Sequence, residues 1–487
     1  MIAGPGPSTS PARTHAVATS TGAAHPALVI AVVAFAMTTV AIMQVISVPL
    51  LPSLPEIFGT SISSASWVAT ATLICGAAVN PIIGRMGDMY GKRPLLLGCL
   101  AIAVVGTAIA ATADSLLQVV IGRAIQGIAS GVIPLCYGVI RDQLASRHLS
   151  RGVAVITAAG AGVGAGFGPV AMGAVLSAHG WRVVFWVTGA LLLLALLLMV
   201  AIVRGPETRA PARFDVVGAL VLAGSLVVLL LGITNGAGWG WGSARVLTLL
   251  VTAAAMVVWW VWWERRRPEP MVDLVLNGRG PVLLAHVGGL MIGAATFTQF
   301  ITSFTLVTLP AATGHGLGRS MAMAGLVQIP GAIVATIAVM TTSRLTIGRG
   351  ATPLLRLSAV LLIGGFGLSA LRHGSVTEVA VSVAVVSAGL GVAQCAAPLL
   401  LLEHIGPEQT AAANSVSALA RVVGSVLASA LVTSVMATGA LLVDGTERPA
   451  EWTFLASYAI GALPAVAVGV MSRRRPGVKL ALATNSS

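Results

Sequence analysis

Charged side chains are scarce in this sequence. Asp, Glu, Lys and Arg supply 9% of the 487 residues, whereas 56% are hydrophobic, and the mean hydropathy is +0.95. This composition excludes a soluble globular protein, which needs more charge to face water. The apolar runs are about 20–30 residues long and lack the period-2 alternation of membrane strands. We therefore predict an all-α membrane protein, because lipid offers no hydrogen bonds to an exposed backbone.

Clusters of reactive side chains are also lacking. The four cysteines lie inside apolar runs and form no CxxC pair, so we interpret them as packing residues without a redox or metal role. The phosphate-binding pattern GxxxxGKS/T does not occur, and no connection between apolar runs exceeds about twenty residues. A nucleotide-hydrolysing domain is therefore not expected, and no cofactor is predicted.

Fourteen apolar runs are long enough to cross a bilayer. The predicted spans are 28–51, 66–83, 95–113, 116–140, 152–178, 183–203, 216–235, 246–263, 281–311, 321–342, 352–371, 377–402, 410–440 and 452–471. With the N-terminus placed in the cytoplasm, twenty of the 28 Lys and Arg residues fall in inside segments, five fall outside and three lie within spans. Positive charge marks cytoplasmic loops. We predict a multi-pass plasma-membrane protein with both termini cytoplasmic, and we assign the net charge of +13 to topology rather than to nucleic-acid binding.

The longest connections, 204–215 and 264–280, are rich in proline and charge and flank the seventh and eighth spans. They divide the spans into two six-helix bundles plus two inserted linker helices. The predicted domains are a disordered cytoplasmic tail at 1–27, an N-terminal bundle at 28–204, a two-helix insert with cytoplasmic linkers at 205–280, a C-terminal bundle at 281–472 and a cytoplasmic tail at 473–487.

The connection after the second span reads GRMGDMYGKR. An ordinary positive-inside turn is one interpretation, with glycines that allow a tight approach to a neighbouring helix. The pattern also resembles the signature loop of the major facilitator superfamily, with Met86 where Leu is usual. The resemblance implies a conformational latch between two six-helix halves, formed by Gly84, Gly87, Asp88, Gly91, Lys92 and Arg93. In a fourteen-span member the cytoplasmic end of the thirteenth span should approach this loop, so the resemblance places Asp88 near Thr410 to Ser415. The positive end of a helix dipole favours a carboxylate there.

An arginine stands inside the fourth span, in the sequence RAIQGIASG. A charge within a span is costly and by default suggests function, although Arg123 could instead extend its head group to the outer interface. Together with Gln126, it resembles the fourth-span motif of proton-coupled members of the superfamily. That resemblance implies a role for Arg123 in sensing or relaying a proton.

The fifth span contains GAGVGAGFGPVAMG, from Gly160 to Gly173. Its glycines recur at intervals of four and line one helix face, and its proline bends the helix. The segment resembles the antiporter motif of exporters in the superfamily, with Met172 replacing one glycine; the alternative is generic small-residue packing. The residues that carry the resemblance are Gly160, Gly164, Gly168, Pro169 and Gly173.

None of the fifteen acidic residues lies at the centre of a predicted span. Many fourteen-span proton antiporters of the superfamily carry an Asp in the first span, where this chain has only Gln44 and Ser47 as polar residues. The candidate proton-relay residues are therefore Arg123, Asp142, Glu403 and His286, although a structural role is the alternative for His286.

Neutral amides are the main polar groups within the spans. They suit an amphipathic organic substrate held between apolar walls, but they also serve as hydrogen-bonding links between helices. The candidates for a mid-membrane substrate cavity are Gln44, Asn80, Gln126, Gln299, Gln328 and Gln394.

These features favour a secondary active transporter that exports a small amphipathic molecule, such as a drug or antibiotic-like natural product, by proton antiport and alternating access. An uptake permease or uniporter of the same fold is the alternative within transport. A membrane sensor or enzyme would require a metal cluster, a set of nucleophilic residues or a soluble domain, and none is recognisable. The expected partners are the substrate, protons and the bilayer, and we expect a monomer.

Overall fold

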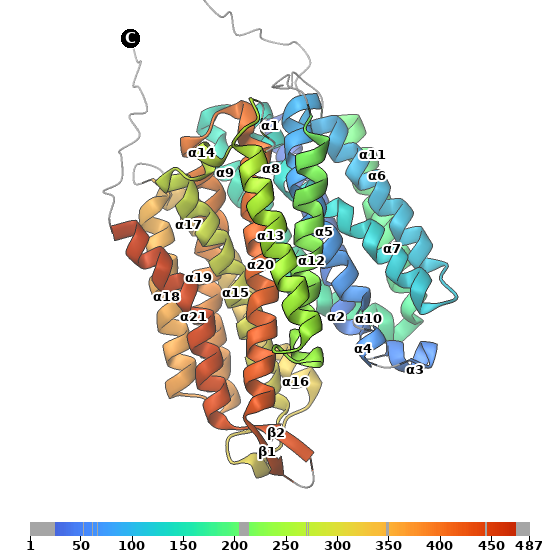
Figure 1. The fold of residues 1–487 in the computed structure, drawn as a ribbon, viewed down its shortest axis with the longest axis vertical. Coiled ribbons are helices and arrows are strands. Elements are labelled where there is room, and N and C mark those ends of the chain that lie inside the picture. Colours follow the sequence, from blue (N-terminus) through green and yellow to red (C-terminus); the bar gives the residue numbers. More distant parts are fainter. Residues whose placement is uncertain are drawn as a thin grey trace, which may run out of the picture.

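A computed structural model of the chain describes residues 25–51, 53–60, 62–65, 67–203, 214–268, 270, 272–346, 350–443 and 446–473 (Figure 1). Fourteen of its helical segments are long and apolar enough to cross a membrane, as the sequence predicts. The predicted tails at 1–27 and 473–487 lie outside the described residues except for 25–27 and 473, as does most of the linker before the seventh span.

The first six spans comprise the segments up to residue 202. Short helices precede the second span, and the fifth span contains a ten-residue π-helix. The elements are α1 Pro26–Val45, α2 Ser47–Leu50, α3 Leu54–Phe58, α4 Ile62–Ala65, α5 Trp67–Tyr90, α6 Lys92–Ala111, α7 Leu116–Ile128, η1 Ala129–Gly131, α8 Val132–Gln143, α9 Ser146–Thr157, the π-helix η2 Ala158–Phe167, α10 Gly168–His179 and α11 Trp181–Ile202.

Two long helices and a short one follow, and then six more spans. The hairpin β1–β2, in which Ala440 pairs with Pro449, lies between the last two spans and has no counterpart in the predicted elements. The elements are α12 Val216–Trp239, α13 Ala244–Glu264, α14 Leu274–Asn277, α15 Gly280–Thr308, η3 Ala311–Thr313, α16 Met321–Leu326, α17 Gln328–Thr346, α18 Thr352–Leu371, α19 Val376–His404, η4 Pro407–Gln409, α20 Thr410–Thr438, β1 Ala440–Val443, β2 Thr446–Pro449 and α21 Glu451–Arg473.

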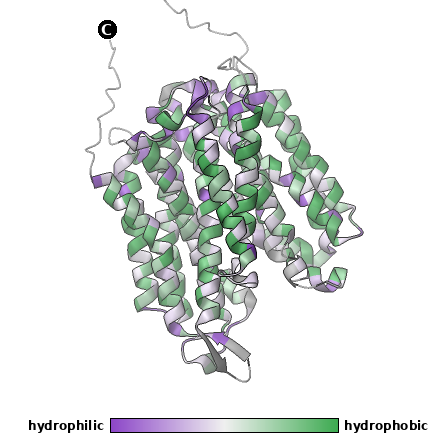
Figure 2. Ribbon diagram, in the orientation of Figure 1, coloured by the Kyte–Doolittle hydropathy of each residue, from purple (hydrophilic) through white to green (hydrophobic). Residues whose placement is uncertain are grey.

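Helix starts follow from local sequence. The side chains of Ser115, Asp215 and Ser375 each accept a hydrogen bond from the backbone N–H three residues later, at 3.3, 3.0 and 3.2 Å. Such N-caps satisfy backbone donors that have no partner within the helix. Figure 2 shows apolar residues along the lengths of the helices and hydrophilic residues gathered near their ends, the pattern expected of a membrane bundle.

Most of helices α1–α11 lie on the right of Figure 1 and most of helices α15–α21 on the left, with α9 reaching over above α17. We call these groups the N-half and the C-half, and we call the end at which α1 begins and α21 finishes the terminal end. The two halves meet where α5 packs against α20 and where α9 and η2 pack against α17. The inserted helix α12 contacts both α5 and α20, through an apolar cluster that includes Ala77, Leu230 and Val422.

Candidate functional site at the junction of the two halves

The last turns of α5 press closely against α20 because their sequence supplies glycine. A Cβ atom at Gly84 would overlap the side chain of Ser415, and one at Gly87 would overlap Leu135 in α8. Gly91 joins α5 to α6 with φ of 106°, a conformation that side chains disfavour. Gly84, Gly87 and Gly91 thus have separate steric reasons, and Gly84 is the one whose Cβ would overlap the C-half. Gly84 and Gly87 lie within α5, so the predicted loop is helical up to Tyr90.

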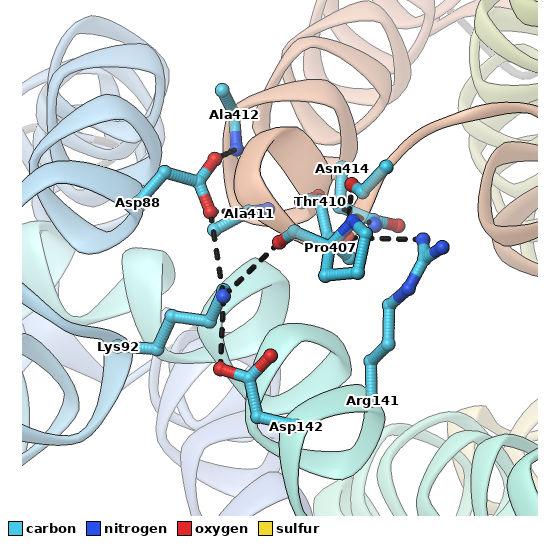
Figure 3. Close-up of polar contacts among 10 residues, drawn as sticks. Asp88, Lys92, Arg141, Asp142, Pro407, Thr410, Ala411, Ala412 and Asn414 are labelled. Carbon is cyan, nitrogen blue, oxygen red and sulfur yellow. Dashed lines mark hydrogen bonds and ion pairs between the residues drawn. The ribbon is translucent and has the colours of Figure 1, made fainter. Parts of the chain in front are cut away.

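The Asp88 carboxylate lies at the N-terminus of α20 (Figure 3). It accepts hydrogen bonds from the backbone N–H of Ala411 at 3.2 Å and of Ala412 at 2.8 Å, and the side chain is completely buried. These N–H groups have no partner within their own helix and carry the positive end of its dipole. A single carboxylate of the N-half therefore satisfies two donors of the C-half.

Lys92 is buried beside this contact. Its ammonium group donates to Asp142 at 2.9 Å and to the backbone carbonyl of Pro407 at 3.2 Å, and it lies 3.7 Å from Asp88. One oxygen of Asp142, Oδ1, is buried without a hydrogen-bond partner in the described part of the chain. Asp88, Lys92 and Asp142 thus form one buried charge cluster that reaches from the N-half to the C-half.

Two further polar contacts join the halves at the terminal end. Arg141 in α8 donates to the hydroxyl of Thr410 at 3.0 Å, and Ser150 in α9 donates to the carbonyl of Ser343 in α17 at 2.9 Å. Arg93, in contrast, bonds within the N-half, to the carbonyls of Val200 and Val203. Arg141 was not among the predicted latch residues; its place in the RD pair directly after the fourth span was the available signal.

Arg123 is fully buried and does not extend to the interface. Its five N–H donors all have acceptors, which are neutral: the carbonyls of Met43, Gln44 and Val68, the Gln126 amide oxygen and the Ser47 hydroxyl. Met43 and Gln44 lie in the last turn of α1, where helix carbonyls favour a cation. This guanidinium therefore joins α7 to the end of α1 and the start of α5.

The glycines of the fifth span face two different helices. Gly160, Gly164 and Gly168 lie against α1, within the N-half, while Gly168 and Pro169 begin α10, which also contains Gly173. The intervening glycines face α17: a Cβ at Gly162 would overlap Thr336, and one at Gly166 would touch Ala332. Gly162 and Gly166, which alternate with the glycines of the predicted stripe, are thus the residues that let the two halves approach each other here.

Most of the candidate amides bond to other helices. Asn80 accepts from Ser130 at 3.1 Å, Gln126 donates to Thr107 at 2.6 Å, Gln299 donates to Ser387 at 3.2 Å and Gln328 donates to Ser303 at 2.8 Å. Gln394 is half-buried, and its amide has no hydrogen-bond partner among the described residues.

Two of the proton-relay candidates lie apart from the charge cluster. The ring of His286 bonds to Asn277 at 2.8 Å, next to the linker that leads into the C-half. Glu403 accepts from the backbone N–H of Ala351 at 3.1 Å, at the N-terminus of α18. Neither contact crosses from one half to the other, and of the four candidates only Asp142 is bonded to a latch residue among the described residues.

Comparison with known proteins gives a consistent result. A family model described as Major Facilitator Superfamily matches residues 31–216. The chain is 26% identical to the uncharacterized MFS-type transporter YvkA of Bacillus subtilis, over 78% of this chain and 84% of that one. It is 27% identical to the multidrug efflux pump LfrA of Mycolicibacterium smegmatis, over 90% of this chain and 86% of that one. The crystal structure of the human organic anion transporter MFSD10 shares its fold, with a TM-score of 0.65 and 19% identity over 91% of this chain and 99% of that one.

Proposed function

We propose that this chain, which belongs to the major facilitator superfamily of membrane transporters and resembles its fourteen-span drug:proton antiporter branch, exports a small amphipathic organic molecule by proton antiport. The observation that carries the proposal is the bond between the Asp88 carboxylate and the N-terminus of α20. It holds the halves together at one end only, as alternating access requires.

In the proposed cycle the terminal end is the cytoplasmic end, and both termini are cytoplasmic. The N-half and the C-half, which correspond to the bundles predicted at 28–204 and 281–472, rock against each other as units. The insert at 205–280 stays at the periphery. Opening toward the cytoplasm breaks the contacts of Asp88 with Ala411 and Ala412, and the hydrogen bond from Arg141 to Thr410 separates with them.

Asp142 is the proposed link between the proton and this movement. Its carboxylate is the closest anion to Lys92, and its second oxygen is buried with no partner among the described residues, so a proton can reside there without breaking another bond. Protonation removes the negative charge that holds Lys92, and a lysine released from Asp142 weakens the cluster around Asp88. Arg123, whose acceptors are neutral, is assigned a positioning role.

The direction of transport is inferred from two features. The glycine–proline segment of the fifth span resembles the antiporter motif, and the relative LfrA is described as an efflux pump. An uptake transporter of the same fold would instead accumulate its substrate in right-side-out vesicles.

The test is dye accumulation in everted vesicles whose lumen is acidified by respiration, using the anionic dye fluorescein and the cationic dye rhodamine 123. We expect accumulation that disappears when an uncoupler collapses the gradient. Asp142→Asn should abolish this gradient dependence while downhill movement persists. Uphill accumulation that survives the uncoupler contradicts proton antiport, and accumulation only in right-side-out vesicles contradicts export.

A further inference from the structure

A second arginine lies deep within a span, in α20. Arg421 is eleven residues past Thr410, which begins that helix, and therefore about 16 Å along its axis. It is half-buried. Its backbone carbonyl packs against Gly293 of α15, where a Cβ would not fit, so α20 is held tightly at this level.

The three arginines within the spans differ in their partners. Arg123 has acceptors for all five of its N–H donors, and Arg356 donates to the hydroxyl and carbonyl of Ser472 at the terminal end. The guanidinium of Arg421 has no hydrogen-bond or ion-pair partner anywhere in the described residues. A cation inside a membrane protein is costly unless it is paired, so its lack of a partner requires an explanation.

The side of α20 that carries Arg421 faces the N-half. Thr410 lies eleven residues, or about three helical turns, before Arg421 and therefore on nearly the same face of α20. Its hydroxyl accepts a hydrogen bond from Arg141 of α8 at 3.0 Å, and α20 packs against α8. Arg421 thus lies among helices of both halves, in the region where transporters of this architecture hold their substrates.

The carboxylates at the junction of the two halves are engaged away from Arg421. Asp88 and Asp142 are engaged at the terminal end with Ala411, Ala412 and Lys92. No described carboxylate is paired with Arg421. With no paired carboxylate among the described residues, the planar guanidinium is suited to bind a carboxylate or sulfonate of a ligand through two parallel hydrogen bonds.

We propose that Arg421 is a substrate-binding residue and that the transported molecule is an organic anion. The inference rests on the proposed transport function and narrows its substrate class, from any amphipathic molecule to one with a carboxylate or sulfonate group.

The test compares two dyes built on the same three-ring core, fluorescein as the anion and rhodamine 123 as the cation. Their binding to purified protein in lipid nanodiscs is measured by fluorescence anisotropy without a proton gradient. We expect fluorescein to bind at least about tenfold more tightly than rhodamine 123, and Arg421→Gln to weaken fluorescein binding by at least about tenfold while changing rhodamine 123 binding by less than about twofold.

Arg356→Gln is the matched control, because it removes an arginine from a span but lies at the terminal end, and it should leave both affinities unchanged. Arg421→Lys keeps the charge but loses the two parallel hydrogen bonds, so its fluorescein affinity should lie between those of the wild type and Arg421→Gln. A lysine variant with wild-type fluorescein affinity contradicts the bidentate contact, and this variant provides an answer if the glutamine variant does not fold. The proposal is overturned by a wild-type protein without preference for fluorescein, by unchanged binding in Arg421→Gln, or by binding that follows chloride concentration and ignores dye charge. Because the assay uses no gradient, its failure is distinguishable from a failure of proton antiport.

Discussion

Replacing Asp88 with Asn removes one charge from the contact between the halves and keeps the size of the side chain. In the structure the carboxylate accepts two backbone N–H groups of α20 and lies 3.7 Å from Lys92. The asparagine side chain would present one amide oxygen and one NH2 group, so one of the two α20 donors would face another donor. The state in which the halves are joined at this end should therefore lose stability relative to the open one.

The size of the effect follows from these contacts. Hydrogen bonds to a charged group contribute about 1.5–3 kcal/mol each and neutral ones about half as much. The helix dipole adds roughly 0.3–1 kcal/mol for the charge. Part of the loss is offset because a buried carboxylate no longer has to be desolvated. We expect a net shift of about 2 kcal/mol, which corresponds to roughly a 30-fold change in the ratio of closed to open molecules.

Spin labels provide the assay. Tyr90 at the end of α5 and Arg473 at the end of α21 are exposed and lie at the terminal end of opposite halves. With the native cysteines replaced by alanine, Tyr90→Cys and Arg473→Cys are labelled, and the distance distribution is measured by pulsed electron paramagnetic resonance. Asp88→Asn should add or enlarge a population at longer distance.

Glu403→Gln is the matched control. Glu403 also accepts a backbone N–H at a helix N-terminus, that of Ala351, but both residues belong to the C-half. Its loss should leave the distance distribution unchanged. An Asp88→Asn protein with the wild-type distribution, or an equal shift in both variants, would refute the assignment of Asp88 as the latch.

Two other positions give independent predictions. Arg123→Met leaves five acceptors without their donors and should lower the free energy of unfolding by about 2–4 kcal/mol. The thermal unfolding midpoint in nanodiscs should fall, and that of Arg123→Lys should lie between this variant and the wild type. An unchanged midpoint contradicts a structural role for this hydrogen-bond network. Gly162→Val should overlap Thr336 and reduce transport at least about tenfold, whereas Gly364→Ala, which has open space where its Cβ would stand, should be silent. Equal activity of the two glycine variants would show that the approach of η2 to α17 is unimportant.

Several features of the site were accessible from the sequence because they depend on local pattern. The order of glycines, Asp88 and cations after the second span carried the family resemblance, and that resemblance placed Asp88 near Thr410 to Ser415. In the structure its carboxylate bonds to Ala411 and Ala412. The isolated arginine in the fourth span was equally conspicuous. Its acceptors were not, because Val68 and Met43 contribute backbone carbonyls, and any residue type supplies those.

The number and order of the spans were determined by the sequence itself, because hydropathy is a property of each segment alone. Their ends were not: the second span, predicted to end at residue 83, continues as α5 to Tyr90, and the first, predicted to reach residue 51, ends as α1 at Val45. Which segments face one another was decided only by the tertiary structure. The glycines of the fifth span divide between α1 and α17, and Arg141 meets Thr410 from 269 positions away. The three arginines within the spans look alike in the sequence, yet only Arg421 has no hydrogen-bond or ion-pair partner in the described chain. Such differences arise from packing between distant segments, which no local pattern encodes.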